Sequence, residues 1–118
     1  MSLATLAILL SGAGVLVTGW LAAIFVANPV TAMGKVHHLP EHLPQVMTDR
    51  YIANFALAAA ATFYGDLWVI AGLFAVFAFM AFADAVIYRR AGKPHAPHGI
   101  AGVGAAVVAL VALAGAAA

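Results

Sequence analysis

Polar side chains capable of chemistry are rare in this sequence, and they interrupt or open long apolar runs. Asp84 stands five residues before Arg89, near the end of one such run, which places it about 7 Å inside the run on a helix. An ionisable group at that depth is costly unless it is paired, so it is a functional candidate by default. Two other apolar runs open on polar residues at the same end. We therefore predict a ligand-binding site made of Asp49, Arg50, Asn54, Asp84 and His98.

Two interpretations of this cluster remain open. In the functional one, an amphipathic small molecule places its head group on the polar residues. In an enzyme, Asp84 or His98 would then be the catalytic acid or base, because both side chains exchange protons. In the structural one, Asp84 and Arg50 form a buried ion pair that fixes the helix register, with Asn54 and His98 as hydrogen-bond partners. The residues do not decide whether the chain is an enzyme.

The histidines are the second source of candidate chemistry. Imidazole together with Glu41 or Asp84 is able to bind zinc, copper or iron. However, Pro40 interrupts the helix on which His38 and His42 would share a face, and the sequence has no HExxH motif. We therefore favour histidines that are only interfacial polar residues. The alternative is a metal site with the candidate ligands His38, His42 and His95, and no cofactor is assigned.

The elements that position these residues follow from composition. Of the 118 residues, 66% are hydrophobic and only 8% are charged, which is far outside the range of soluble globular proteins. A helix of about 20 apolar residues spans the hydrocarbon core of a bilayer. The uncharged runs therefore predict an all-α, single-domain bundle of four transmembrane helices, with helices over about 3–27, 44–64, 66–88 and 98–117 and a polar cytoplasmic loop over 28–43.

Turn residues separate the predicted helices. Asn28-Pro29 ends the first helix, because proline disfavours a helical conformation in the residue before it. A single helix over 51–88 would be about 57 Å long, roughly twice the hydrocarbon thickness. Gly65-Asp66 therefore forms a hairpin, with Gly65 suited to end one helix and Asp66 to begin the next. The run over 2–27 lacks a basic start and is too long for a signal peptide, so we expect a retained helix.

The basic residues predict the orientation of the bundle. With four spans, every lysine and arginine falls on one side of the membrane, which the positive-inside rule makes cytoplasmic. Both chain termini and the Gly65-Asp66 turn then lie on the other side. We expect a multi-pass protein of the bacterial inner membrane. The residues that carry this prediction are Lys35, Arg50, Arg89, Arg90 and Lys93.

Small residues recur at intervals of four on two of the predicted helices. Helices in lipid associate by close packing of such residues, so these stripes are expected to pack the monomer internally or to form a subunit interface. Cysteine is absent, which removes disulfides and thiolate chemistry. No basic stripe suited to nucleic acid is present. The two stripes are Gly19, Ala23 and Ala27, and Ala101, Ala105 and Ala109.

Three short motifs resemble those of a group of small bacterial four-helix membrane proteins. They are "DRYIANFALA" at the start of the second predicted helix, "FADAVIYRRAGK" at the end of the third and "PHGIAGVGAA" at the start of the fourth. The chain resembles DoxX-like proteins and a neighbouring family known only as a domain of unknown function. The resemblance covers about 49–118. It has no counterpart for the His-Leu-Pro segment, residues 38–44, in which this triplet occurs twice. It implies a four-helix fold with recurring charged positions like Asp49, Arg50 and Asp84, and no activity.

The sequence thus predicts a small membrane protein with a polar site at the cytoplasmic end of its bundle, which binds or converts a small amphipathic or apolar molecule. The alternative is a structural or accessory subunit that packs against a larger membrane complex through its small-residue stripes. A transporter is less favoured, because so small a bundle would have to oligomerise to form a pathway. The expected partners are the lipid bilayer and either further copies of the chain or a larger complex.

Overall fold

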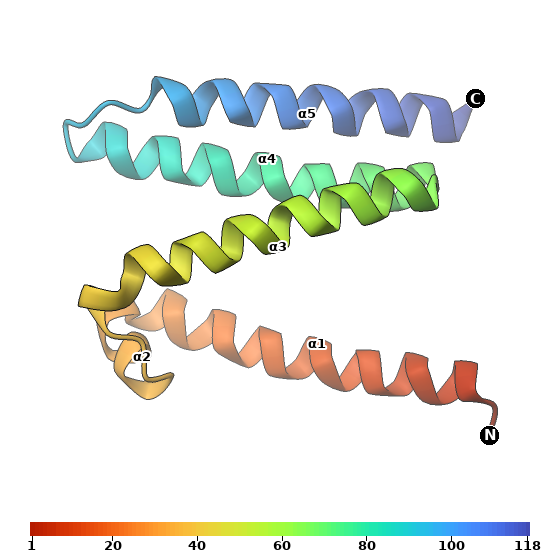
Figure 1. Ribbon diagram of the computed structural model, residues 1–118, viewed down its shortest axis with the longest axis horizontal. Helices are drawn as coiled ribbons and strands as arrows, with labels where there is room; N and C mark the ends of the chain where they lie inside the picture. Colours follow the sequence, from red (N-terminus) through yellow and green to blue (C-terminus); the bar gives the residue numbers. More distant parts are fainter. The chain divides into compact units, whose positions relative to one another are not determined.

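The computed structural model describes residues 1–118, and the chain is all-helical, as the sequence predicts (Figure 1). Three helices are long and apolar enough to cross a membrane, and they are α1, α4 and α5. Helix α3 is not among them, because its first turns hold several polar residues. The elements are α1 (Leu3–Ala27), α2 (Pro29–Lys35), the 3₁₀ turn η1 (Pro40–His42), α3 (Leu43–Tyr64), α4 (Leu67–Arg90) and α5 (Ala96–Ala117).

The first compact unit, Met1–Thr48, contains the predicted helix end and one helix that was not predicted. Asn28 is extended, with φ −158° and ψ 98°, and ends α1. Its side-chain oxygen accepts a hydrogen bond from the Thr31 backbone N–H at 3.1 Å, and Pro29 occupies the first helical turn. These are strong helix-start signals. The prediction of a polar loop over 28–43 therefore missed α2, which packs on α1 through the buried Ala32.

Helix α2 ends with a histidine in the left-handed region. His37 has φ 60° and follows the cap residue Val36. The His38 backbone N–H donates to the Met33 carbonyl at 2.8 Å, and the His37 N–H donates to the Gly34 carbonyl at 3.2 Å. This is the Schellman arrangement, in which glycine is the usual left-handed residue. The regular helix therefore stops before the His-Leu-Pro repeat begins.

The second compact unit, Asp49–Ala118, reverses direction at Gly65-Asp66 (Figure 1). Gly65 has φ 78°, which costs a glycine little. The Asp66 carboxylate accepts hydrogen bonds from the backbone N–H groups of Trp68 and Val69, at 2.8 and 3.0 Å. It therefore caps α4. The left-handed glycine and the capping aspartate are the roles that the sequence predicts for these two residues.

Removal of this cap should weaken the second unit measurably. We expect Asp66→Ala to lower the free energy of unfolding by about 1 kcal/mol, because two amide groups at the start of α4 lose their acceptor. Asp66→Asn should be close to wild type, since asparagine caps as well as aspartate. Unfolding in a denaturing-detergent titration, followed by circular dichroism, measures the difference. Equal losses for both variants would show that the charge matters and not the cap.

Helices α4 and α5 pack side by side in antiparallel directions (Figure 1), and α3 does not pack against either of them. The α4–α5 contact is a seam of small residues. It buries Ala71 and Ala78 on α4, seven residues apart, and a matching row on α5. Such spacing keeps one face of a helix against its neighbour. The matching row consists of Gly102, Ala109 and Ala112.

The observed seam corrects the predicted stripes. On α5, Ala109 is buried and Ala105 is half-buried, but Ala101 is exposed and Gly102 takes its place. The reason is geometric. Residues spaced strictly by four move gradually around the helix, whereas alternating spacings of three and four average 3.5 residues and stay on the face that contacts the neighbouring helix. On α1, Gly19, Ala23 and Ala27 are all exposed.

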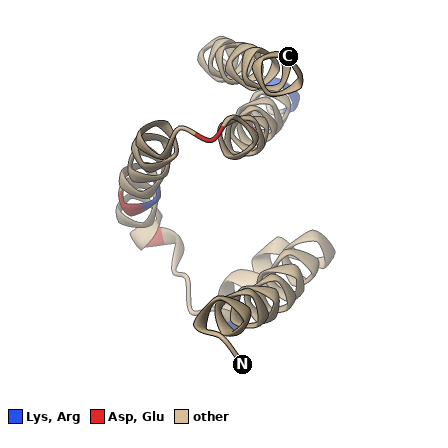
Figure 2. Ribbon diagram, turned by 90° about the vertical axis from the view of Figure 1, so that its right-hand side faces the viewer, with Lys and Arg blue, Asp and Glu red and all other residues tan.

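Basic residues gather at one end of the α4–α5 pair (Figure 2). An acidic residue marks the connection between α3 and α4, and this is the capping Asp66. The basic residues Arg89 and Arg90 form the last turn of α4, at the opposite end. Cations at a helix C-terminus interact favourably with the helix dipole. The basic end of this pair is also where the predicted polar residues of α4 and α5 lie.

Candidate functional site

Asp84 and His98 meet at the basic end of the α4–α5 pair. The Asp84 Oδ2 atom lies 3.9 Å from the His98 Nδ1 atom, and this is the single contact within 4.0 Å between an acidic side chain and a lysine, arginine or histidine. The distance is longer than a hydrogen bond, so the pair is loose. The side chains are partly open, with 45% of Asp84 and 33% of His98 exposed. The pair is therefore accessible from outside the two helices.

Local helix geometry explains why these two residues meet. His98 lies in the first turn of α5, and the connection Ala91–His95 is short enough to set that turn beside the last two turns of α4. Asp84 lies six residues before the end of α4, about 9 Å along the helix. Four residues separate His98 from Gly102, so both lie on one face of α5. The close approach at Gly102 thus brings His98 near α4.

Tyr88 is a member of the site that the sequence analysis missed. Its ring stacks on the His98 ring, with centroids 5.0 Å apart and an angle of 17° between the planes. In the sequence, Tyr88 is only the last residue of the third predicted helix, 66–88. The spacing of four between Asp84 and Tyr88, which places both on one helix face, is a signal that would have found it. The stacked ring holds the imidazole in place beside the carboxylate.

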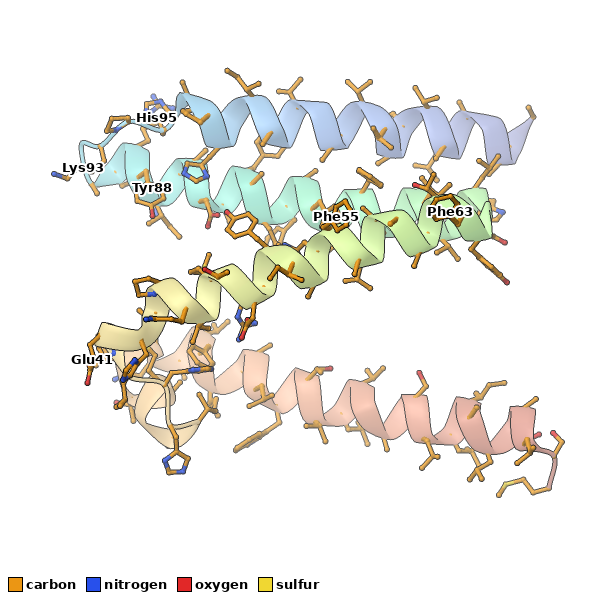
Figure 3. All side chains as sticks on the ribbon, viewed as in Figure 1. Glu41, Phe55, Phe63, Tyr88, Lys93 and His95 are labelled. Atoms are coloured by element: carbon orange, nitrogen blue, oxygen red, sulfur yellow. The ribbon has the colours of Figure 1, made fainter.

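The connection between α4 and α5 adds cations to this end. Gly92 has φ 69°, and the Lys93 backbone N–H donates to the Tyr88 carbonyl at 2.9 Å. This hydrogen bond keeps the Lys93 backbone against the end of α4. In Figure 3, Lys93 lies at the tip of the connection and points away from the helices, with Tyr88 and His95 close by. The His95 Nδ1 atom lies 3.3 Å from the Lys93 carbonyl oxygen.

The other predicted site residues lie on α3 and are not brought to this pair. Asp49 and Arg50 are exposed, and Asn54 is half-buried. No carboxylate lies within 4.0 Å of Arg50, and α3 does not pack against α4 or α5. The structure therefore pairs Asp84 with His98 and not with Arg50. The predicted ion pair between Asp84 and Arg50 is not formed.

The histidines do not gather around a common point. No group of three or more histidine, aspartate or glutamate side chains is arranged to hold a metal ion. His38 follows the end of α2, His42 lies in η1, and His95 is the residue before α5. The pair Asp84–His98 offers two ligands by itself. Its chemistry is that of a carboxylate beside an imidazole, two groups that are able to hydrogen-bond a polar molecule and to exchange a proton.

The comparisons with known proteins add no assignment. No family model, no curated protein and no solved structure matches the chain. The resemblance to DoxX-like proteins therefore stays a prediction from the three short motifs. The class of protein is defined by its own features, which are three apolar helices able to cross a membrane and a polar pair on two of them.

Proposed function

We propose that this protein binds or converts a small amphipathic molecule at the Asp84–His98 pair, with the site at the cytoplasmic end of a four-span bundle in a bacterial inner membrane. The observation that carries this proposal is the 3.9 Å contact between a partly open carboxylate and a partly open imidazole inside two apolar helices. Polar groups at that depth are expensive in lipid, and they are usually associated with a ligand or a proton path. A pair with a purely structural role would stabilise the protein more if its side chains approached to hydrogen-bond distance.

The basic residues support α3 as the fourth span. If α3 did not cross the membrane, the connection with Arg89, Arg90 and Lys93 would lie on the opposite side from Lys35. Such a split contradicts the positive-inside rule. Helix α3 has 22 residues, about 33 Å, which is long enough to span. Its polar first turns would then lie at the same membrane surface as the Asp84–His98 pair.

Asp84→Asn and His98→Ala should each release the bound amphipathic molecule. Loss of a hydrogen bond to a charged group weakens binding by about tenfold, and we expect this loss directly in His98→Ala and through the displaced His98 ring in Asp84→Asn. The measurement is the amount of small molecule per mole of purified protein, extracted into organic solvent and quantified by mass spectrometry. Asp66→Asn is the matched control, because it makes the same change at the other end of α4 and keeps the cap. Unchanged ligand content in folded Asp84→Asn and His98→Ala proteins would refute the site.

A structural or accessory subunit is the second candidate function. The observation that favours it is α1, where Gly19, Ala23 and Ala27 are all exposed. Close packing of small residues is the usual basis of helix association in lipid. A larger membrane protein that copurifies in mild detergent, and is lost when Ala23 is changed to leucine, would support this function. The Asp84→Asn substitution should leave such a complex intact.

A further inference from the structure

The charges at the Asp84–His98 site indicate which head group it would accept. Arg89, Arg90 and Lys93 bring three positive charges to the end of α4 and its connection. None of them has a carboxylate within 4.0 Å. The one acidic side chain at this end, Asp84, already faces His98. The basic end of the pair therefore carries cations without a counter-charge from the chain, and it attracts anions.

The short connection keeps these cations at the same end of α4 and α5 as the polar pair. The hydrogen bond from Lys93 to the Tyr88 carbonyl keeps the connection close to the end of α4. The His98 ring stacks on Tyr88, its Nδ1 atom lies 3.9 Å from the Asp84 carboxylate, and its Nε2 atom forms no hydrogen bond within the chain. Nε2 is therefore free to meet a ligand. Arginine side chains bind phosphate through two parallel N–H groups, which lysine and histidine do not.

The apolar part of the ligand has a surface beside the site. Exposed apolar side chains lie on both helices just inside the basic end. They include Ile87 on α4, which is 61% exposed, and Ile100 on α5, which is 72% exposed. In a bilayer these side chains face hydrocarbon. An alkyl chain beside either helix would keep its head group level with His98 and the cations.

We infer that the site takes a phosphate group carried on an alkyl chain, an inference that rests on the proposed function. Two sources share this chemistry, an anionic phospholipid of the membrane and a smaller alkyl phosphate. The phosphate accepts from Arg89 and Arg90 and approaches the free nitrogen of His98. The alkyl chain lies along α4 and α5. Asp84 takes no part in binding the anion directly and instead positions the His98 ring.

Titration with matched probes tests this inference. Wild-type protein in dodecyl maltoside is titrated with dodecyl phosphate, dodecanol and inorganic phosphate, and bound probe is counted by native mass spectrometry. We expect dodecyl phosphate to bind about tenfold more tightly than either of the others, because dodecanol lacks the charge and inorganic phosphate lacks the chain. Displacement of dodecyl phosphate by phosphatidylglycerol, but not by phosphatidylcholine, would identify the source as membrane lipid. No displacement would identify a smaller alkyl phosphate.

Single substitutions locate the site. Arg89→Gln and Arg90→Gln should each weaken dodecyl phosphate binding about tenfold through loss of a charge-assisted hydrogen bond. Each variant keeps two cations at this end, so its orientation in the membrane is preserved. Lys35→Gln, on α2, removes the same charge elsewhere and should leave binding unchanged. If Lys35→Gln weakens dodecyl phosphate binding as much as Arg89→Gln and Arg90→Gln do, the attraction is nonspecific and the inference is overturned.

The outcomes separate this inference from the proposed function. If dodecanol binds as tightly as dodecyl phosphate and Asp84→Asn weakens it, the phosphate preference is wrong and the amphipathic site stands. If inorganic phosphate binds as tightly as dodecyl phosphate, the inferred contribution of an alkyl chain to binding is wrong. If none of the three probes binds the wild-type protein, both the inference and the proposed site at Asp84–His98 are wrong.

Discussion

Cysteines introduced at Leu3 and Ala118 should react with a membrane-impermeant maleimide from the same, external side of intact cells. Four spans place both chain ends on the non-cytoplasmic side, and Leu3 and Ala118 lie at these ends. The chain has no cysteine of its own, so each variant reports one position without background. A cysteine in place of Lys93, on the connection between α4 and α5, should stay unlabelled until the cells are opened.

The result discriminates between three spans and four in an all-or-none manner. If α3 does not cross the membrane, α4 and α5 are inverted, and the labelling of Lys93→Cys and Ala118→Cys exchanges while that of Leu3→Cys is unchanged. Three basic residues would then lie outside, against the positive-inside rule. Such an exchange would contradict the cytoplasmic placement of the Asp84–His98 pair. The Asp84–His98 pair itself would remain, facing the other compartment.

Helix ends were predictable because their signals are local. Asn28-Pro29 and Gly65-Asp66 each act through the conformation of one or two residues and a cap within four residues. Helix α2 was missed although its start uses the same residues that end α1. A count of polar residues over 28–43 favoured a loop, whereas the Asn28 cap and Pro29 favour a short helix.

The site was predictable only where helix spacing and chain connection determine it. Asp84 and His98 lie at one depth because a short connection joins their helices, and the structure brings them together. Arg50 lies on α3, whose place beside α4 depends on packing in lipid and on no local signal. Nothing in the spacing of Asp84 and Arg50 predicts that they remain apart. The stacked Tyr88 was visible in the sequence as a spacing of four from Asp84.

Gly102→Leu should have the largest effect on stability of any single change in the α4–α5 pair. A Cβ atom at Gly102 would lie 2.6 Å from the Cδ1 and Cε1 atoms of the Phe82 ring, which is closer than side-chain atoms pack. Leucine adds three more carbons at this point. We expect a loss of about 1–3 kcal/mol in the free energy of unfolding, the usual cost of overpacking a tight contact. Denaturing-detergent titration followed by circular dichroism measures it.

Gly104→Leu is the matched control, because a Cβ atom at Gly104 meets no atom within 4 Å. It makes the same change on the same helix and should be neutral or slightly stabilising, since leucine favours a helix more than glycine does. If both variants lose the same free energy of unfolding, α5 does not tolerate leucine at either position for a reason unrelated to the seam. The close approach at Gly102 would then not be the cause.

The origin of the Gly102 effect can be isolated by changing its neighbour. Phe82 is 40% exposed, so its ring can be removed at limited cost. If the clash is with this ring, Phe82→Ala should recover most of the stability of Gly102→Leu, and the two changes should be clearly non-additive. Because His98 lies one turn before Gly102, the Gly102→Leu protein should also lose ligand at the Asp84–His98 pair, and the double variant should regain it. If the losses in free energy of unfolding for Phe82→Ala and Gly102→Leu simply add, the clash is with another part of α4.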